Sequence, residues 1–144
     1  PIIKQQDKMK HWADLLGRVL LSAIFIFEAY DSIKYHHTTL EVMAAYNITW
    51  RPVFLLNLSI FLLFAGGLMV LLGYRPKLGA FMLLLYWVPV TFIRHSFWND
   101  PISIEREQSV HFMKNLAIIG GLIVVLVNGT GRFSIRKLFD TTKF

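Results

Sequence analysis

One run of 22 residues, from Pro52 to Gly73, contains no ionisable side chain, and Asn57 is its only strongly polar residue. A helix rises about 1.5 Å per residue, so about 20 apolar residues are enough to cross the hydrocarbon core of a bilayer. Pro52 suits the first turn of such a helix, where its missing N–H group is no loss. The run therefore predicts a transmembrane helix, and it sets the class of fold for the whole chain.

The composition of the whole chain also indicates a membrane protein. Hydrophobic residues make up 55% and charged residues only 17% of the 144 positions, whereas soluble domains are typically about 25% charged. The net charge of +6 does not indicate a nucleic-acid partner, because the Lys and Arg residues lie in tails and short connections. The lack of cysteine excludes disulfides, thiolate metal sites and cysteine nucleophiles.

Three further segments have the length and apolar character of membrane spans. We therefore expect a single membrane domain over residues 1–144, folded as an all-α, four-transmembrane-helix antiparallel bundle. The short basic turn from Tyr74 to Lys77 forces the second and third spans to run antiparallel. The ends of the chain, residues 1–13 and 129–144, are expected to be cytoplasmic tails. The four expected spans cover residues 14–34, 52–73, 78–98 and 110–128.

The distribution of Lys and Arg predicts the orientation of this bundle. Four spans put both termini on the same side of the membrane. Ten of the fifteen cationic residues fall on that side, so the positive-inside rule predicts that both termini are cytoplasmic. The ten are Lys4, Lys8, Lys10, Arg18, Arg75, Lys77, Arg132, Arg136, Lys137 and Lys143; the other five are Lys34, Arg51, Arg94, Arg106 and Lys114.

Individual residues predict how the spans pack. The paired glycines Gly66–Gly67 and Gly120–Gly121 permit the close approach of neighbouring helices. Pro89 lies within the third span, where it removes a backbone hydrogen bond and predicts a kink. Arg18 lies near the start of the first span and is expected to extend outward to the interface. Trp87 is expected to be a membrane anchor or a pocket wall.

The connections are expected to contain little regular structure. Residues Leu40 to Tyr46 predict a short helix that lies on the membrane surface. The adjacent His36 and His37 would point apart on a helix, so we expect them in a loop and without a metal role. The connection from Asn99 to Ser109 is expected to be a solvated loop or a lid.

Ionisable residues gather at one end of the predicted bundle. Charge near the end of a lipid-length helix is costly unless it reaches the interface, faces the protein interior or lines a wet cavity. Such a layer could bind a quinone head group, relay protons or hold a small anion, and it could equally be a structural polar network. No metal site is expected. The candidate ligand-binding residues, from the first, third and fourth spans, are Glu28, Asp31, Arg94, His95, Trp98, His111, Lys114 and Asn115.

Three short motifs of the second half occur in a known order: His95-Ser96-Phe97-Trp98, Phe112-Met113-Lys114-Asn115 and Gly129-Thr130-Gly131-Arg132-Phe133-Ser134. They follow a glycine-paired helix, a basic turn and an aromatic-rich helix. With these elements, about residues 52–135 resemble the DoxX family of small bacterial membrane proteins. The resemblance implies a four-helix protein of the bacterial cytoplasmic (inner) membrane.

The same resemblance implies a redox association, because the related DoxD-type subunits belong to thiosulfate:quinone oxidoreductase. His95 and Lys114 are then the strongest carried-over site residues, with Arg94 and Asn115 beside them. The expected function is that of a membrane subunit of an oxidoreductase, which contacts quinone through the polar layer and has no intrinsic cofactor.

Two alternatives to the redox subunit remain. One is a non-catalytic scaffold or accessory subunit of a larger membrane complex. The other is a transporter or channel, which the lack of repeat-related broken helices makes weaker. The partners expected for either kind of subunit are the lipid bilayer, other membrane subunits and further copies of this chain.

Overall fold

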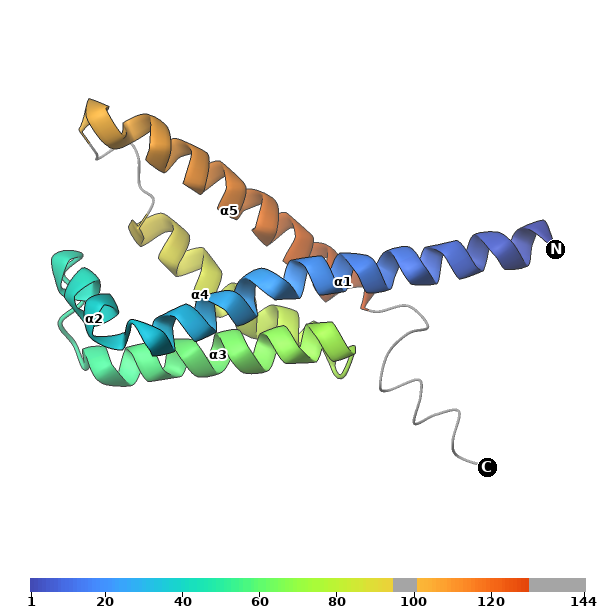
Figure 1. Ribbon diagram of the computed structural model, residues 1–144, viewed down its shortest axis with the longest axis horizontal. Coiled ribbons are helices and arrows are strands. Elements are labelled where there is room, and N and C mark those ends of the chain that lie inside the picture. Colours follow the sequence, from blue (N-terminus) through green and yellow to red (C-terminus); the bar gives the residue numbers. More distant parts are fainter. Residues whose placement is uncertain (95–100, 130–144) are drawn as a thin grey trace.

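The computed structural model describes residues 1–94 and 101–129, and these residues form five helices. The helices α1 and α3 run side by side in opposite directions, and α4 returns along α3 (Figure 1). We call the end where α1 and α4 finish, and where α3 and α5 begin, the α2 end. The bounds are α1 (Ile2–Lys34), α2 (His36–Ala45), α3 (Pro52–Leu72), α4 (Pro76–Arg94) and α5 (Ile102–Asn128).

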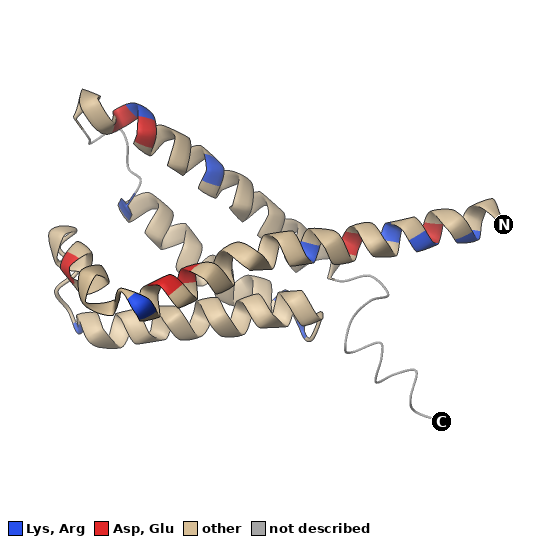
Figure 2. Cartoon of the chain, in the orientation of Figure 1, with Lys and Arg blue, Asp and Glu red and all other residues tan. Residues whose placement is uncertain are grey.

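Among the described residues, three helices, α3, α4 and α5, are long and apolar enough to cross a membrane. The fold is therefore that of an all-helical membrane protein, as expected. The helix α1, expected to be the first span, does not qualify by composition, because charged residues interrupt its apolar stretch. Figure 2 shows this contrast, since α3 carries no charged residue along its length whereas α1 carries several.

Several helices begin earlier than the sequence predicted, and the differences are largest for α1 and α5. The expected tail of residues 1–13 is helical from Ile2, and this part of α1 projects beyond the rest of the molecule (Figure 1). The helix α5 begins at Ile102, eight residues before the expected Val110, so residues 102–109 are not the loop that we expected. Glu105 lies in the first turn of α5, where a negative charge stabilises the helix. Residues 95–100, which include the expected end of the third span and the start of the expected connection, and residues 130–144 lie outside the described part.

The helix α2 follows α1 and packs against the beginning of α3. A helix was expected from Leu40, but α2 begins at His36, so the expectation of a histidine loop was wrong. The His36 Nε2 atom lies 3.2 Å from the Asn57 Oδ1 atom of α3. The Tyr46 hydroxyl group donates a hydrogen bond of 3.3 Å to the Arg94 carbonyl oxygen of α4. These two contacts tie the short helix to the neighbouring ends of α3 and α4.

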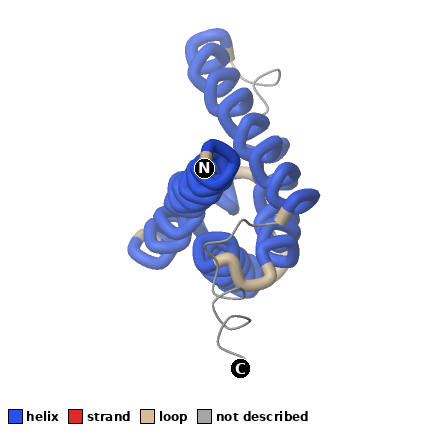
Figure 3. The backbone as a smooth tube through the Cα atoms, turned by 90° about the vertical axis from the view of Figure 1, so that its right-hand side faces the viewer, coloured by secondary structure: helices blue, strands red, loops and turns tan. Residues whose placement is uncertain are grey.

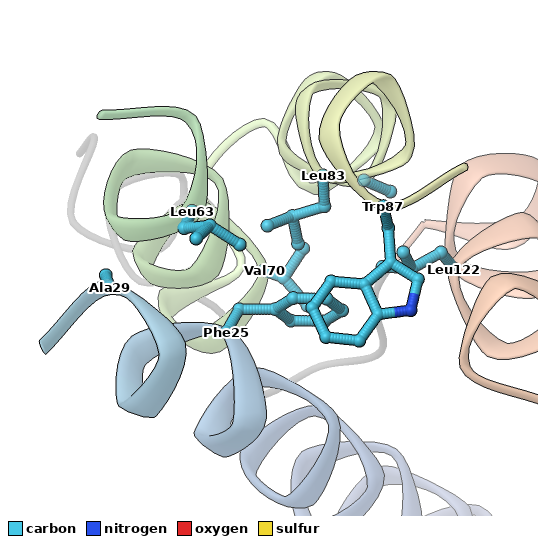
Figure 4. Close-up of a cluster of buried hydrophobic side chains, with 8 residues drawn as sticks. Phe25, Ala29, Leu63, Val70, Leu83, Trp87 and Leu122 are labelled. Atoms are coloured by element: carbon cyan, nitrogen blue, oxygen red, sulfur yellow. The ribbon is translucent and has the colours of Figure 1, made fainter. Parts of the chain in front are cut away.

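The hydrophobic core joins four helices (Figure 4). The rings of Phe25 and Trp87 meet edge to face, with 5.0 Å between their centroids. Trp87 is only 6% exposed, so it is a core residue and not an interfacial anchor. The buried members of the core are Phe25, Ala29, Leu63, Val70, Ala80, Leu83, Trp87 and Leu122.

Small residues bring α3 into close contact with a helix on each side. A Cβ atom added to Gly66 would lie 2.8 Å from Leu83 Cγ and 3.0 Å from the Gly79 carbonyl oxygen, both on α4. A Cβ atom added to Gly67 would lie 3.1 Å from Ile26 Cγ1 on α1. The expected close approach is therefore confirmed for this glycine pair.

The second glycine pair behaves differently. Nothing lies within 4 Å of a Cβ atom added to Gly120, and one added to Gly121 meets only Leu21 of α1, at 3.5 Å. The expectation of close packing was therefore wrong for Gly120. Gly120 is exposed whereas Leu122 is buried, so Gly120 lies on the outer face of α5. The beginning of α5 leans away from the other helices, as the view along the bundle shows (Figure 3).

We expected Arg18 to extend outward to the interface, but its side chain instead caps the end of α3. Its side chain is 2% exposed, and its Nη1 atom lies 2.9 Å from the Leu71 carbonyl oxygen and 3.3 Å from that of Val70. Its Nε atom donates to Asp14 Oδ2 at 2.9 Å. The last carbonyl groups of a helix have no partner within it and carry partial negative charge. The helix end therefore satisfies a guanidinium group that would otherwise be costly to bury.

Candidate functional site

A cavity of about 720 Å³ lies among α1, α4 and α5 toward the α2 end. We call it the polar cavity, because charged side chains from α1, α4 and α5 and amide side chains from α5 line it. Its volume lies within the range of small-molecule sites, about 300–1,000 Å³. The lining residues are Ile24, Glu28, Tyr86, Trp87, Val90, Thr91, Arg94, Gln108, His111, Lys114, Asn115, Ala117 and Ile118.

The polar cavity contains five of the eight candidate residues. Since α1 and α4 end where α5 begins, residues far apart in the sequence meet there (Figure 1). The residues brought together are Glu28, Arg94, His111, Lys114 and Asn115. Asp31 is half-buried on α1 and does not line the cavity. His95 and Trp98 lie outside the described residues.

Each helix contributes one stripe of its surface. On α4, Tyr86, Val90 and Arg94 follow one another at intervals of four residues, which places them along one face. On α5, His111 and Lys114 are three residues apart and continue a similar stripe. The ring of Phe92 on α4 meets that of Phe112 on α5 at 5.6 Å. This contact joins the two helices close to the charged residues.

Several hydrogen-bonding side chains of the polar cavity are available to a ligand. Glu28 is half-buried, and the charges of Arg94 and Asp31 act on its carboxylate. His111 Nε2 lies 3.8 Å from Glu107 Oε1, one turn earlier on α5. In residues 1–94 and 101–129, no hydrogen bond or ion pair engages the side chains of Glu28, Arg94, Lys114 and Asn115. These groups can therefore serve a bound molecule or water.

Tyr86 and Gln108 are among the polar residues of the cavity that sequence reasoning missed. Tyr86 lies eight residues before Arg94, which is two helical turns, so a projection of the third span would have found it. Gln108 lies three residues before His111, but it was assigned to the connection because α5 was expected to begin at Val110. Both residues line the polar cavity.

The described residues offer no evident metal site. Among them, no group of three or more His, Cys, Asp or Glu side chains is arranged to hold a metal ion. The polar cavity instead combines two cationic side chains, one carboxylate, one imidazole and two amides. Such a set is suited to hydrogen bonding and charge pairing with the polar part of a small molecule.

Two relatives match this chain over most of their own length. The chain is 30% identical to the inner membrane protein YqjF of Escherichia coli over 133 residues, which cover 92% of this chain and 96% of that protein. It is 20% identical to the inner membrane protein YphA of the same organism over 123 residues, 85% of this chain and 87% of YphA. No solved structure matches the chain.

A longer relative is the Surfeit locus protein 4 homolog of Schizosaccharomyces pombe. The identity is 29% over 137 residues, which make up 94% of this chain but only 40% of that protein. The relatives named as inner membrane proteins and the apolar helices together show a membrane-embedded protein.

The comparisons overturn the resemblance to the DoxX family. That resemblance rested on short motifs at helix ends and on glycine pairs, which membrane helices use for general packing reasons. The SURF4 family model, by contrast, matches residues 1–140, nearly the whole sequence. The chain therefore belongs to the SURF4 family.

Proposed function

We propose that this protein binds, in the polar cavity, a small molecule whose polar head carries anionic or carbonyl oxygens. The observation that carries the proposal is the convergence of Arg94, Lys114 and Asn115 on one cavity of about 720 Å³. Within the described residues, their side chains form no hydrogen bond or ion pair with the protein. Ionisable residues at membrane depth are costly and usually serve a function.

The lining indicates the chemistry of the ligand. Two cations, Arg94 and Lys114, face one carboxylate, that of Glu28, and this balance favours an anionic head. The planar guanidinium group matches a carboxylate or a phosphate with two parallel hydrogen bonds. A quinone head group, with two carbonyl oxygens, is the neutral alternative. An oxidoreductase partner is not part of the proposal, because that expectation rested on the DoxX resemblance.

Neutralising either cation should weaken binding about ten- to a hundredfold. A hydrogen bond to a charged group contributes about 1.5–3 kcal/mol, and each 1.4 kcal/mol is a factor of ten. The variants are Arg94→Gln and Lys114→Gln in phosphatidylcholine nanodiscs, and the measurement is native mass spectrometry with dodecyl phosphate or a short-chain quinone. Arg106→Gln is the control, since Arg106 is exposed on α5 and lines no described cavity.

The pattern of binding decides the proposal. Loss of dodecyl phosphate binding in both cavity variants, with normal binding in Arg106→Gln, supports an anionic head. Binding of the quinone alone supports the neutral head. Equal binding of both ligands by all three variants contradicts the proposal.

We also propose that α1 is a fourth membrane span and that both termini are cytoplasmic. In support, α1 begins and α5 ends toward the same end of the molecule (Figure 1). The charge of Arg18 is matched by Asp14 and by the carbonyl groups of α3, which lowers the cost of burying it. Ten of the fifteen Lys and Arg residues lie on the side of the termini in this arrangement.

Single cysteines test this orientation, because the sequence contains no other thiol. Lys4→Cys, near the start of α1, should react with a membrane-impermeant maleimide only after bacterial spheroplasts are permeabilised. Glu41→Cys, exposed on α2, should react in intact spheroplasts. Labelling of both residues from the same side would show an even number of crossings between them and exclude the arrangement with α1 as a span. 

The chain would then cross the membrane only through α3, α4 and α5, and its two termini would lie on opposite sides.

A second candidate function is that of an accessory subunit, and the exposure of α5 favours it. Only 6% of the apolar 18-residue stretch of α5 is buried, against 28% for that of α3 and 33% for that of α4. Its free surface suits lipid, another membrane subunit or a second copy of the chain. The native mass spectra described above also test this candidate, because a bound subunit or a second copy adds its mass to that of the chain.

A further inference from the structure

A second cavity, of about 340 Å³, lies among α2, α3 and α4. We call it the apolar cavity, because aliphatic side chains form most of its wall. It lies within the size range of small-molecule sites, like the polar cavity. Representative lining residues are Met43, Leu55, Leu58, Leu62, Leu85 and Ile93.

The hydroxyl groups at its wall are largely occupied by the protein itself. Ser59 Oγ donates to the Leu55 carbonyl oxygen at 2.8 Å, and Thr39 Oγ1 donates to that of Tyr35 at 2.9 Å. The Tyr46 hydroxyl group donates to the Arg94 carbonyl oxygen at 3.3 Å. These hydroxyl protons are therefore already used, and the cavity suits an occupant without polar groups.

The two cavities share part of their walls. Tyr86, Val90 and Arg94, the stripe along α4, line both of them. The polar cavity extends from this stripe toward α1 and α5, and the apolar cavity extends toward α2 and α3. A cationic side chain thus stands at the boundary between a site for a polar head and a site for an apolar body.

We propose that the two cavities hold one amphiphile, a single-chain lipid with an anionic phosphate or carboxylate head. The head lies in the polar cavity between Arg94 and Lys114, and the alkyl chain lies in the apolar cavity. This inference rests on the proposed function and names the class of its ligand. It also explains why a strongly apolar cavity adjoins a charged one.

The apolar cavity selects the ligand more than it strengthens binding. An alkyl chain that leaves a bilayer for the protein exchanges one apolar environment for another, because lipid tails are as apolar as Leu. The affinity therefore comes mainly from the charged head. The chain site decides which anionic molecules fit, and it favours one unbranched chain over a bulky polar body.

A photoreactive probe tests where the chain lies. The probe is a 12-carbon alkyl phosphate with a diazirine at the end of its chain, added to the protein in phosphatidylcholine nanodiscs. After irradiation, mass spectrometry maps the labelled residues. We expect labelling at Met43, Leu58 and Leu62 that excess dodecyl phosphate prevents, and at least tenfold less of it in Arg94→Gln and Lys114→Gln.

A variant that fills the apolar cavity gives a second test. Leu62→Trp should abolish the protected labelling at Leu58 and Met43 while the melting temperature stays near that of the wild type. Leu72→Trp is the control, since Leu72 is exposed at the other end of α3 and should leave the labelling unchanged. Persistent labelling of Leu58 in a folded Leu62→Trp protein would overturn the inference.

The outcomes separate this inference from the proposed function. If excess dodecyl phosphate prevents labelling, and the labelling needs Arg94 and Lys114 but falls on exposed residues of α5, the head site stands and the chain site is wrong. If the labelling neither saturates nor depends on the two cations, the proposed function itself is wrong.

Discussion

Replacing Arg18 with Met should lower the free energy of unfolding by about 3 kcal/mol, because buried charged hydrogen bonds are lost and their partners stay unpaired. The Leu71 and Val70 carbonyl groups at the end of α3 lose their donor, and Asp14 loses its ion pair. Met keeps most of the apolar stem, so the change tests the guanidinium group. The measurement is a titration with SDS in mixed micelles, followed by circular dichroism.

Two matched variants control for the loss of a charge. Arg18→Lys keeps the charge but supplies one ammonium group in place of the forked guanidinium, so we expect it to recover only part of the stability. Lys8→Met removes a cation from the exposed, projecting part of α1 and should change the stability by less than about 0.5 kcal/mol. If Arg18→Met is as stable as the wild type, the contact between Arg18 and the end of α3 does not stabilise the fold.

Enlarging Gly66 to Leu should also cost about 3 kcal/mol, because the new side chain must push α4 away from α3. Its Cβ atom alone would lie 3.0 Å from the backbone oxygen of Gly79, which cannot move without the helix. Overpacked cores typically lose about 1–3 kcal/mol, and at this position Leu adds three more carbon atoms. The same SDS titration measures the change, and Gly66→Ala should give a smaller loss.

The second glycine pair supplies the control for this prediction. Gly120 has open space around it, so Gly120→Ala should leave the bundle intact and slightly favour the helix, since Ala is the better helix former. Equal losses from Gly66→Ala and Gly120→Ala would show that the contact between α3 and α4 is not as close as described.

For α3, α4 and α5 the sequence predicted the apolar spans better than it predicted where they begin and end. The uncharged run from Pro52 predicted α3 almost to the residue, because composition alone decides whether a helix suits lipid. The start of α5 was missed, since residues 102–109 are mostly polar, with Ile102 and Ile104 as their only apolar members. The position of Arg18 could not be predicted either, because its partners lie 52 and 53 residues further along the chain.

Part of the candidate site was visible in the sequence and part was not. Helical spacing grouped His111, Lys114 and Asn115 correctly, and the antiparallel order of the spans brought them to Glu28 and Arg94. The apolar cavity left no signal of its own, because side chains that line a cavity and side chains that face lipid have the same composition. Only the arrangement of α2, α3 and α4 distinguishes them.

The cap on α3 has a consequence for the biosynthesis of the protein. The ribosome completes Arg18 more than fifty residues before the carbonyl groups of Val70 and Leu71 exist. Until then the guanidinium group has no helix end to bind, and its free energy is lowest in water or among lipid head groups. In the proposed arrangement with α1 as a span, the first helix reaches its final depth only after α3 has been synthesised, so its insertion is coupled to helix assembly.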